Sequence, residues 1–233
     1  MALIEITNDA YTVLIDDNYS NACLAQKSQL LLSSGTDLVD CYQVVLNYTT
    51  SEVPHLALEL NDIVIGAVFT MRSGNTWSWY IFFRKAYVNR TINYYIFTVP
   101  SQVANANGLV QLFDGTGKIV FDSNLNYMMV KGFYQGPAGN AAIGSDLVSG
   151  RTYAAIAVQP FVMRTHIMSP PAQASPPYNF LDVNAVGMFA RSGNSIIAPT
   201  GVTQSGNNLS DNPGNQNYSS GNPRVLVVDV TGF

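Results

Sequence analysis

Short runs of β-branched and aromatic residues, with apolar side chains at alternate positions, follow one another along almost the whole chain. No segment shows the i, i+3, i+4, i+7 apolar spacing of an amphipathic helix over three turns. Gly, Asn, Asp and Pro interrupt the runs at short intervals, as turns between antiparallel strands do. The pattern therefore predicts an all-β fold, an antiparallel β-sandwich with repeated β-hairpins and long polar loops. The predicted strands are 2–7, 11–16, 28–33, 41–48, 56–60, 63–71, 77–84, 91–99, 109–113, 118–122, 127–133, 152–158, 161–167, 183–190 and 224–230.

One hairpin pattern occurs twice. Residues 3–18 (LIEITNDAYTVLIDDN) align without a gap on residues 109–124 (LVQLFDGTGKIVFDSN), with strand over strand and a shared Asp at the end of each second strand. The turn residues between the strands differ, so the repeat indicates a reused folding unit and not a shared ion site. It either opens each of two β units, 1–105 and 106–233, or supplies two equivalent hairpins to one sandwich, and we favour the second.

We accordingly predict a sandwich core at residues 1–135 that contains both hairpins, with a β-rich part at 136–233 packed on the same core. The segment 168–180 contains four prolines, which have no N–H for a β-ladder, and it predicts an extended arm. The Asn-, Gly- and Ser-rich segment 203–223 predicts a long projecting loop that ends at an apolar strand.

Charge limits the classes of partner. Charged residues make up 11% of the chain, less than half of the usual ~25%, which suits a surface that meets other subunits. The net charge is −4 and basic residues do not cluster beyond Arg84-Lys85, which argues against nucleic-acid binding through a basic patch. The first residues do not read as a secretory signal, and no apolar run approaches the ~20 residues that span a bilayer. We therefore predict neither export by the general route nor membrane insertion.

The sequence contains two cysteines, Cys23 and Cys41, and two histidines, His55 and His166. The cysteines are interpreted as reduced residues in or near the core of a protein made in a cytoplasm, with a disulfide between them left open. Together with the distant histidines they form no zinc signature. Neither histidine accompanies a nucleophile elbow, so each is interpreted as a half-buried strand residue. The sequence predicts no catalytic residue, no metal site and no cofactor.

Acidic residues at the hairpins could be interpreted as calcium ligands, because hard cations prefer clustered oxygen donors. The residues concerned are Asp16, Asp17, Asp114 and Asp122. The alternating acids and closing Glu of an EF-hand are absent. We therefore interpret Asp114 as a turn residue, and Asp16 and Asp122 as residues that end strands.

Aromatic side chains at residues 75–99 could stack on sugar rings if they were exposed, although core or subunit-interface positions are favoured for most of them. Both faces of these strands are apolar enough that both are expected to be covered. The candidate residues for assembly or ligand contact are Trp77, Trp79, Tyr80, Tyr94 and Tyr95, together with Pro170, Pro171, Pro176 and Pro177 of the arm and Asn207 and Asn208 of the loop.

Three segments, GNTWSWYIF, NYYIFTV and GLVQLFDGTGKIVFDSNLNYMMV, together with the opening IEITNDAYTVLIDDNYSNACLAQK, resemble a family of small tail-associated structural proteins of long-tailed bacteriophages. The resemblance covers residues 1–30 and 74–135. It rests on a pattern of apolar, Gly and Asp positions and not on a catalytic signature.

The resemblance implies a non-enzymatic virion protein, made in the bacterial cytoplasm and located at the tail tip or fibre attachment region. Its expected partners are other tail proteins and copies of itself in a symmetric oligomer, with three copies expected because tail tips commonly have threefold symmetry. Two alternatives stay open: a receptor- or glycan-binding module that contacts a host surface glycan or protein, and a capsid or decoration protein. Neither nucleic-acid binding nor a cofactor is expected.

Overall fold

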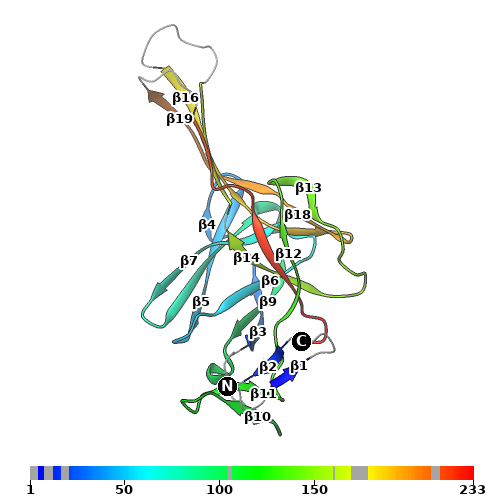
Figure 1. The fold of residues 1–233 in the computed structure, drawn as a ribbon. Coiled ribbons are helices and arrows are strands. Elements are labelled where there is room, and N and C mark those ends of the chain that lie inside the picture. The colour runs from blue at the N-terminus through cyan, green and yellow to red at the C-terminus, as the bar shows by residue number, and fades with distance from the viewer. Residues whose placement is uncertain are drawn as a thin grey trace.

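The computed structural model describes residues 5–7, 13–16, 21–103, 107–159, 161–168, 178–210 and 216–233. These residues form antiparallel strands and two single-turn 3-10 helices, with no α-helix among them (Figure 1), which confirms the all-β prediction. The elements up to residue 103 are β1 (Glu5–Thr7), β2 (Val13–Asp16), β3 (Cys23–Leu31), β4 (Thr36–Asp37), β5 (Cys41–Thr49), β6 (His55–Glu59), β7 (Ile65–Ser73), β8 (Thr76–Arg84), η1 (Lys85–Tyr87), β9 (Thr91–Thr98) and η2 (Pro100–Gln102). Those after it are β10 (Gln111–Phe113), β11 (Ile119–Asp122), β12 (Met129–Gln135), β13 (Gly139–Gly144), β14 (Tyr153–Gln159), β15 (Val162–Met168), β16 (Tyr178–Gly187), β17 (Ala190–Ser192), β18 (Ser195–Ala198), β19 (Thr200–Ser210), β20 (Gln216–Ser219) and β21 (Arg224–Asp229).

The strands form four larger sheets and two separate hairpins. The central sheet has the order β12-β21-β14-β6-β9-β3, and the aromatic sheet has the order β4-β5-β8-β7. The small sheet is β13-β18-β17, and the arm sheet is β19-β16-β15-β20. The hairpins are β1-β2 and β10-β11. Strands from both halves of the chain therefore share one central sheet.

The two hairpins that align in sequence also share one register. Glu5 lies opposite Asp16 in the first, and Gln111 lies opposite Asp122 in the second. Both ladders have an irregularity one step further along, after Ile6 and after Leu112. A bulge changes the course of a strand and is a specific feature of a fold. Its presence at the same place in both hairpins shows that the sequence repeat is also a structural repeat.

The central sheet extends this repeat to the rest of the chain. Its order reads as three strands of the first half and three of the second, β3-β9-β6 and β12-β21-β14, mirrored about the contact between β6 and β14. The edge strands β3 and β12 have register shifts between Leu24 and Gln26 and between Val130 and Gly132, again 106 positions apart (24 and 130, 26 and 132). The chain is therefore two repeats related by a local twofold axis. A hairpin opens each repeat, β1-β2 the first and β10-β11 the second. The division into a core at residues 1–135 and a second part at 136–233 stays a prediction.

A turn of identical sequence, Arg-Ser-Gly-Asn, links two strands in each repeat. In the first repeat it joins β7 to β8, and Gly74 adopts a φ of 60°. Arg72 donates from Nε to the Gly74 carbonyl at 2.8 Å and from Nη2 to the Ser51 carbonyl at 3.1 Å. Its guanidinium lies 5.0 Å from the centre of the Trp77 ring.

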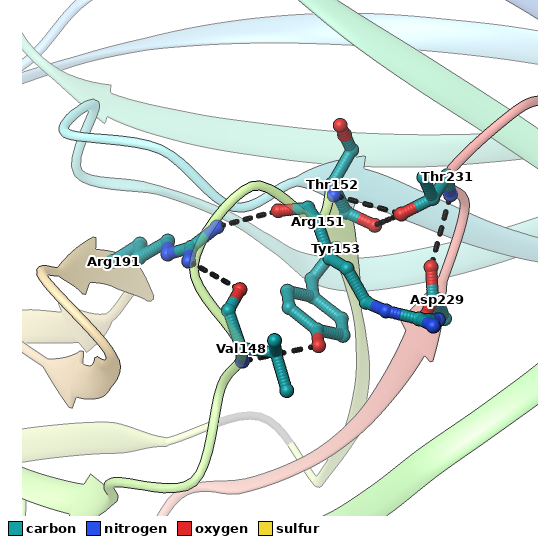
Figure 2. A network of polar contacts seen from close by, with 7 residues as sticks. All are labelled: Val148, Arg151, Thr152, Tyr153, Arg191, Asp229 and Thr231. Atoms are coloured by element: carbon teal, nitrogen blue, oxygen red, sulfur yellow. Dashed lines mark hydrogen bonds and ion pairs between the residues drawn. The ribbon is translucent and has the colours of Figure 1, made fainter.

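The same arginine geometry occurs in the second repeat, where the turn joins β17 to β18. Figure 2 shows the contacts of Arg191 with the carbonyls of Val148 and Arg151. Arg191 donates from Nε to the Gly193 carbonyl at 2.8 Å and from Nη2 to the Val148 carbonyl at 3.1 Å. It also donates from Nη1 to the Arg151 carbonyl at 2.8 Å, and its guanidinium lies 5.5 Å from the centre of the Tyr153 ring. Each repeat thus fastens its outer hairpin to a neighbouring loop with one arginine.

Replacement of these arginines should lower stability unequally. We expect Arg191→Ala to reduce the free energy of unfolding by about 1–3 kcal/mol, because hydrogen bonds from a charged donor to three carbonyls are lost. Arg72→Ala should cost less, since Arg72 is more exposed and contacts two carbonyls. Urea denaturation measures both. Arg191→Lys is the matched control, and full stability in that variant would contradict the account, because an ammonium cannot reproduce the planar fork.

The second repeat contains two insertions that the first lacks. In the first repeat no strand lies between β6 and β7 or between β8 and β9, within the continuously described residues 21–103. At the corresponding places the second repeat inserts β15-β16 and β19-β20. The inserted strands pair with one another as the arm sheet, and β16 and β19 extend away from the body at the top of Figure 1.

The arm sheet corrects the prediction of a long loop at 203–223. Residues 203–210 belong to β19, and residues 216–219 form β20. The Asn-, Gly- and Ser-rich residues of β19 have low intrinsic β-propensity, but they form a strand because they pair with β16 at ten positions. Of the predicted proline arm, Met168 ends β15 and residues 178–180 begin β16. Residues 169–177, with all four prolines, lie outside the described residues.

Apolar residues are buried in clusters between successive sheets. The first cluster packs the central sheet against the aromatic sheet and includes Leu56, Tyr94 and Ile96 with Trp79, Ile81 and Phe83. The second packs the central sheet against the small sheet and includes Tyr153, Val225 and Val227 with Ile196 and Ala198. The third joins the aromatic sheet to the base of the arm sheet and to the small sheet, through Phe82, Val186, Met188 and Ala190.

The four larger sheets therefore follow one another as a propeller-like ring and not as the two layers of the predicted sandwich. The reason is the duplication: each repeat packs its own outer sheet on its own half of the central sheet. A fourth cluster covers the opposite face of the central sheet and contains residues of both repeats, Ala57, Tyr95, Phe97, Ala154, Ile156, Val228 and Val230. The segment just before the edge strand β12 also contacts the edge strand β3, where Leu24 N donates to the Asn126 carbonyl at 2.7 Å.

Both cysteines are free and fully buried, which confirms the interpretation of reduced core residues. Cys23 begins β3 and Cys41 begins β5. Burial raises the pKa of Cys23 to about 12 and that of Cys41 to about 11. The nucleophilic thiolate is therefore scarce at neutral pH.

Alkylation should distinguish the folded from the unfolded thiols. At pH 8 we expect iodoacetamide to leave Cys23 and Cys41 unmodified in the native protein and to modify both in urea, where their pKa values return to the ordinary range. Intact-mass spectrometry counts the adducts. Rapid modification of either thiol without denaturant would show that its surroundings are open to solvent.

Candidate functional site

The five aromatic candidates separate into different environments. Trp79 and Tyr94 are 4% and 6% exposed and lie in the first cluster, whereas Tyr95 is 1% exposed and lies in the fourth. Trp77 is half-buried and donates from Nε1 to the Thr50 carbonyl at 3.2 Å. Tyr80 is partly buried on the outer face of the aromatic sheet. The predicted alternation of faces along β8 and β9 is thus confirmed, but the outer face of the aromatic sheet is only partly covered, contrary to the expectation that both faces are covered.

Burial also changes the chemistry of Tyr95. Desolvation, with a smaller contribution from Glu59, raises the pKa of Tyr95 to about 12.

Asn207 and Asn208 belong to β19, where Asn208 pairs with Phe180, but their side chains lie outside what the structure describes. The role of these candidates in assembly or ligand contact stays a prediction.

The carboxylates of the second hairpin accept hydrogen bonds from protein groups. Asp114 Oδ1 accepts from the Thr116 hydroxyl at 2.7 Å, from Lys118 N at 2.9 Å and from Thr116 N at 2.8 Å, and these bonds lower the pKa of Asp114. Asp122 is buried, which opposes its ionisation, but donors from Gln111, Gly108 and Asn124 outweigh burial and lower its pKa. Both residues therefore have the turn and strand-end roles predicted from the sequence.

The remaining ionisable candidates are dispersed. His55 begins β6 and is exposed, whereas His166 lies in β15 opposite Asp182 and Gln216. Among the described residues, no group of three or more His, Cys, Asp or Glu side chains is placed to hold a metal ion.

One groove combines residues of the aromatic sheet with residues of the arm. It is a shallow, open groove of about 350 Å³ where the base of the arm sheet meets the outer face of the aromatic sheet. Its walls are Leu38, Gln43, Phe69, Phe82, Val162, Val186, Thr203 and Gln204, none of which is charged. Phe69 is 45% exposed and meets the buried Phe82 edge-on, with ring centres 6.1 Å apart.

Polar side chains on the arm side of the groove are held by a neighbouring residue. Asn184 of β16 donates from Nδ2 to Gln204 Oε1 at 3.0 Å, and its carbonyl accepts from Thr203 Oγ1 at 3.2 Å. Gln204 accepts through its oxygen here, so its amide group retains its N–H donors. The arrangement places oriented hydrogen-bonding groups opposite an aromatic wall.

The exposed apolar surface continues from the groove across the aromatic sheet. Phe69 pairs with Tyr80 on β8, which in turn pairs with Val45 on β5. Val45 is 46% exposed, and Met71 on β7 is 60% exposed. Of these residues the sequence indicated only Tyr80. Phe69 was not identified because strand alternation is interrupted between Ala67 and Phe69, where the register shifts.

Comparisons with protein-family models, with curated proteins and with solved structures found no match for this chain. In the part of the chain that the structure describes, no helix has the length and apolar character needed to cross a membrane.

Proposed function

We propose that the chain is a non-enzymatic structural protein of a bacteriophage tail, located at the tail tip or the fibre attachment region and assembled as a symmetric oligomer of three copies. The observation that carries the proposal is the arm sheet, a feature present in one repeat and absent from the other. Its strands add nothing to the central sheet of the body. They form an extension that suits contact with neighbouring subunits.

Side chains on the arm support this role. Leu181 on β16 is 39% exposed and Tyr218 on β20 is 64% exposed, and large exposed apolar side chains are common at contacts between proteins. The low fraction of charged residues, 11%, is consistent with a surface buried in an assembly. The resemblance of residues 1–30 and 74–135 to tail-associated phage proteins points to the same class.

Multi-angle light scattering tests the proposed assembly. We expect a species of three times the 25.3 kDa chain mass that persists on dilution. Tyr218→Asp, which puts a charge on an exposed arm residue, should shift the mass toward the single chain. Phe113→Asp is the matched control, because Phe113 is 49% exposed on the β10-β11 hairpin, and it should leave the mass unchanged. A stable monomer of the unmodified chain at all concentrations would contradict the oligomer.

A further inference from the structure

We propose that the groove between the aromatic sheet and the base of the arm binds a neutral oligosaccharide. This inference goes beyond the structural role proposed above and does not depend on it. It rests on three observations: the groove is built by an insertion, its lining has no charge, and its walls combine an aromatic ring with oriented amide and hydroxyl groups.

The groove exists because of the insertions in the second repeat. Its arm wall consists of Val162, Val186, Thr203 and Gln204, which lie on β15, β16 and β19. Its sheet wall consists of residues on or beside β5, β7 and β8 of the first repeat. Its volume of about 350 Å³ falls in the range of small-molecule sites. A scaffold of two plain repeats would have no such groove, so the duplicated fold alone does not account for it.

The lining selects among ligand classes. A charged ligand would lose its hydration against eight uncharged residues and gain no counter-ion in return. A wholly apolar ligand would cover the amides of Gln43 and Gln204 and leave their hydrogen-bonding groups unsatisfied. A neutral sugar avoids both penalties: it carries no charge, and its pyranose ring presents an apolar C–H face together with a rim of hydroxyl groups.

Some groove residues would contact the apolar face of the sugar, and others would form hydrogen bonds with its hydroxyl groups. The exposed ring of Phe69, beside Phe82, offers the apolar platform. Gln204 offers amide donors from an orientation fixed by Asn184, and Gln43 offers an amide on the opposite wall. Tyr80, Val45 and Met71 extend the platform along the sheet, which suits a chain of sugar units and not a single ring.

Saturation-transfer NMR on the full chain tests the proposal with maltotriose and triacetylchitotriose as neutral probes and 3′-sialyllactose as an anionic one. We expect saturation transfer to at least one neutral trisaccharide and none to sialyllactose. Phe69→Ala and Gln204→Ala should each weaken binding roughly 5–10-fold, the loss expected for one aromatic contact or one hydrogen bond. Phe113→Ala, which removes an equally exposed ring elsewhere, should not change it.

Three outcomes would overturn the proposal: no saturation transfer to either neutral probe at 10 mM, equal binding of sialyllactose, or binding of a neutral probe that both groove variants leave intact. Light scattering of the same samples tests whether a second copy of the chain occupies the groove in place of a sugar. If Phe69→Ala changes the oligomeric mass, a second copy of the chain occupies the groove and the oligosaccharide assignment is wrong. An unchanged trimer without sugar binding would overturn this inference and leave the proposed tail role standing.

Discussion

Phe97→Ala is expected to destabilise the protein by about 3–5 kcal/mol, the range measured for the truncation of a buried phenylalanine. Phe97 is 0% exposed and lies in the fourth cluster, where both repeats contribute side chains. Its ring centre is 6.1 Å from that of Phe233, so the cavity would open beside a second aromatic ring. For a chain of this size the loss corresponds to a fall in melting temperature of roughly 6–20 °C.

Differential scanning fluorimetry measures this change, with Phe113→Ala as the control. Phe113 is 49% exposed, so its truncation should alter stability by no more than ~0.5 kcal/mol. Equal melting temperatures for the two variants would show that the fourth cluster is not a packed core. The equivalent residue of the second repeat, Val228, is also 0% exposed, and Val228→Ala should destabilise the protein in the same direction by a smaller amount.

Gly201→Ala is expected to cost about 1–3 kcal/mol, because it overpacks the contact between the arm and the aromatic sheet. Gly201 lies near the start of β19, directly against Cys41. A methyl group at this position would overlap Cys41 Sγ and would approach Met188 Cε to 2.7 Å. Cys41 and Met188 are both fully buried in the third cluster, so neither side chain has free space to move into.

The same strand provides the control for this variant. Gly206 also lies on β19, but a Cβ built there has no neighbouring atom within 4 Å. Gly206→Ala should therefore leave the unfolding midpoint in urea unchanged, whereas Gly201→Ala should lower it. An unaffected Gly201→Ala variant would show that the arm is not packed against the aromatic sheet as described.

Strands with strong apolar alternation were predictable from the sequence. The ranges expected for β5, β8, β9, β14 and β21 agree with the structure to within two residues at either end. These segments bury one or both faces, so their hydrophobic pattern and their environment agree. The short strands β13, β17 and β18 were missed, because Gly-, Ala- and Ser-rich sequences resemble linkers until a neighbouring strand pairs with them.

The duplication was only partly predictable. The hairpins retain enough sequence similarity to be aligned, but later equivalent positions differ in character. Lys27, which pairs with Tyr95, corresponds to Phe133, which pairs with Leu226. The tetrapeptide Arg-Ser-Gly-Asn, at 72–75 and again at 191–194, was a second signal of the repeat. Its meaning depends on the contacts of the two arginines, which a sequence pattern does not reveal.

The groove could not be predicted because its walls come from distant segments. Gln43 and Gln204 are ordinary polar residues in sequence and come together only when the arm docks on the aromatic sheet. Tyr80 was identified because it belongs to a conspicuous aromatic run. Trp79 and Tyr94, which belong to the same aromatic run of the sequence, are buried by the packing of the two sheets.

The central proposal, that the chain is a structural part of a phage tail, is tested most directly by immunogold electron microscopy of purified phage particles from a culture in which the chain is produced. An antibody raised against the whole folded protein should place gold at the distal end of the tail, and mass spectrometry of the same particles should detect the chain. Gold confined to the head would indicate a capsid or decoration protein. Complete absence of the chain from purified particles would contradict the claim.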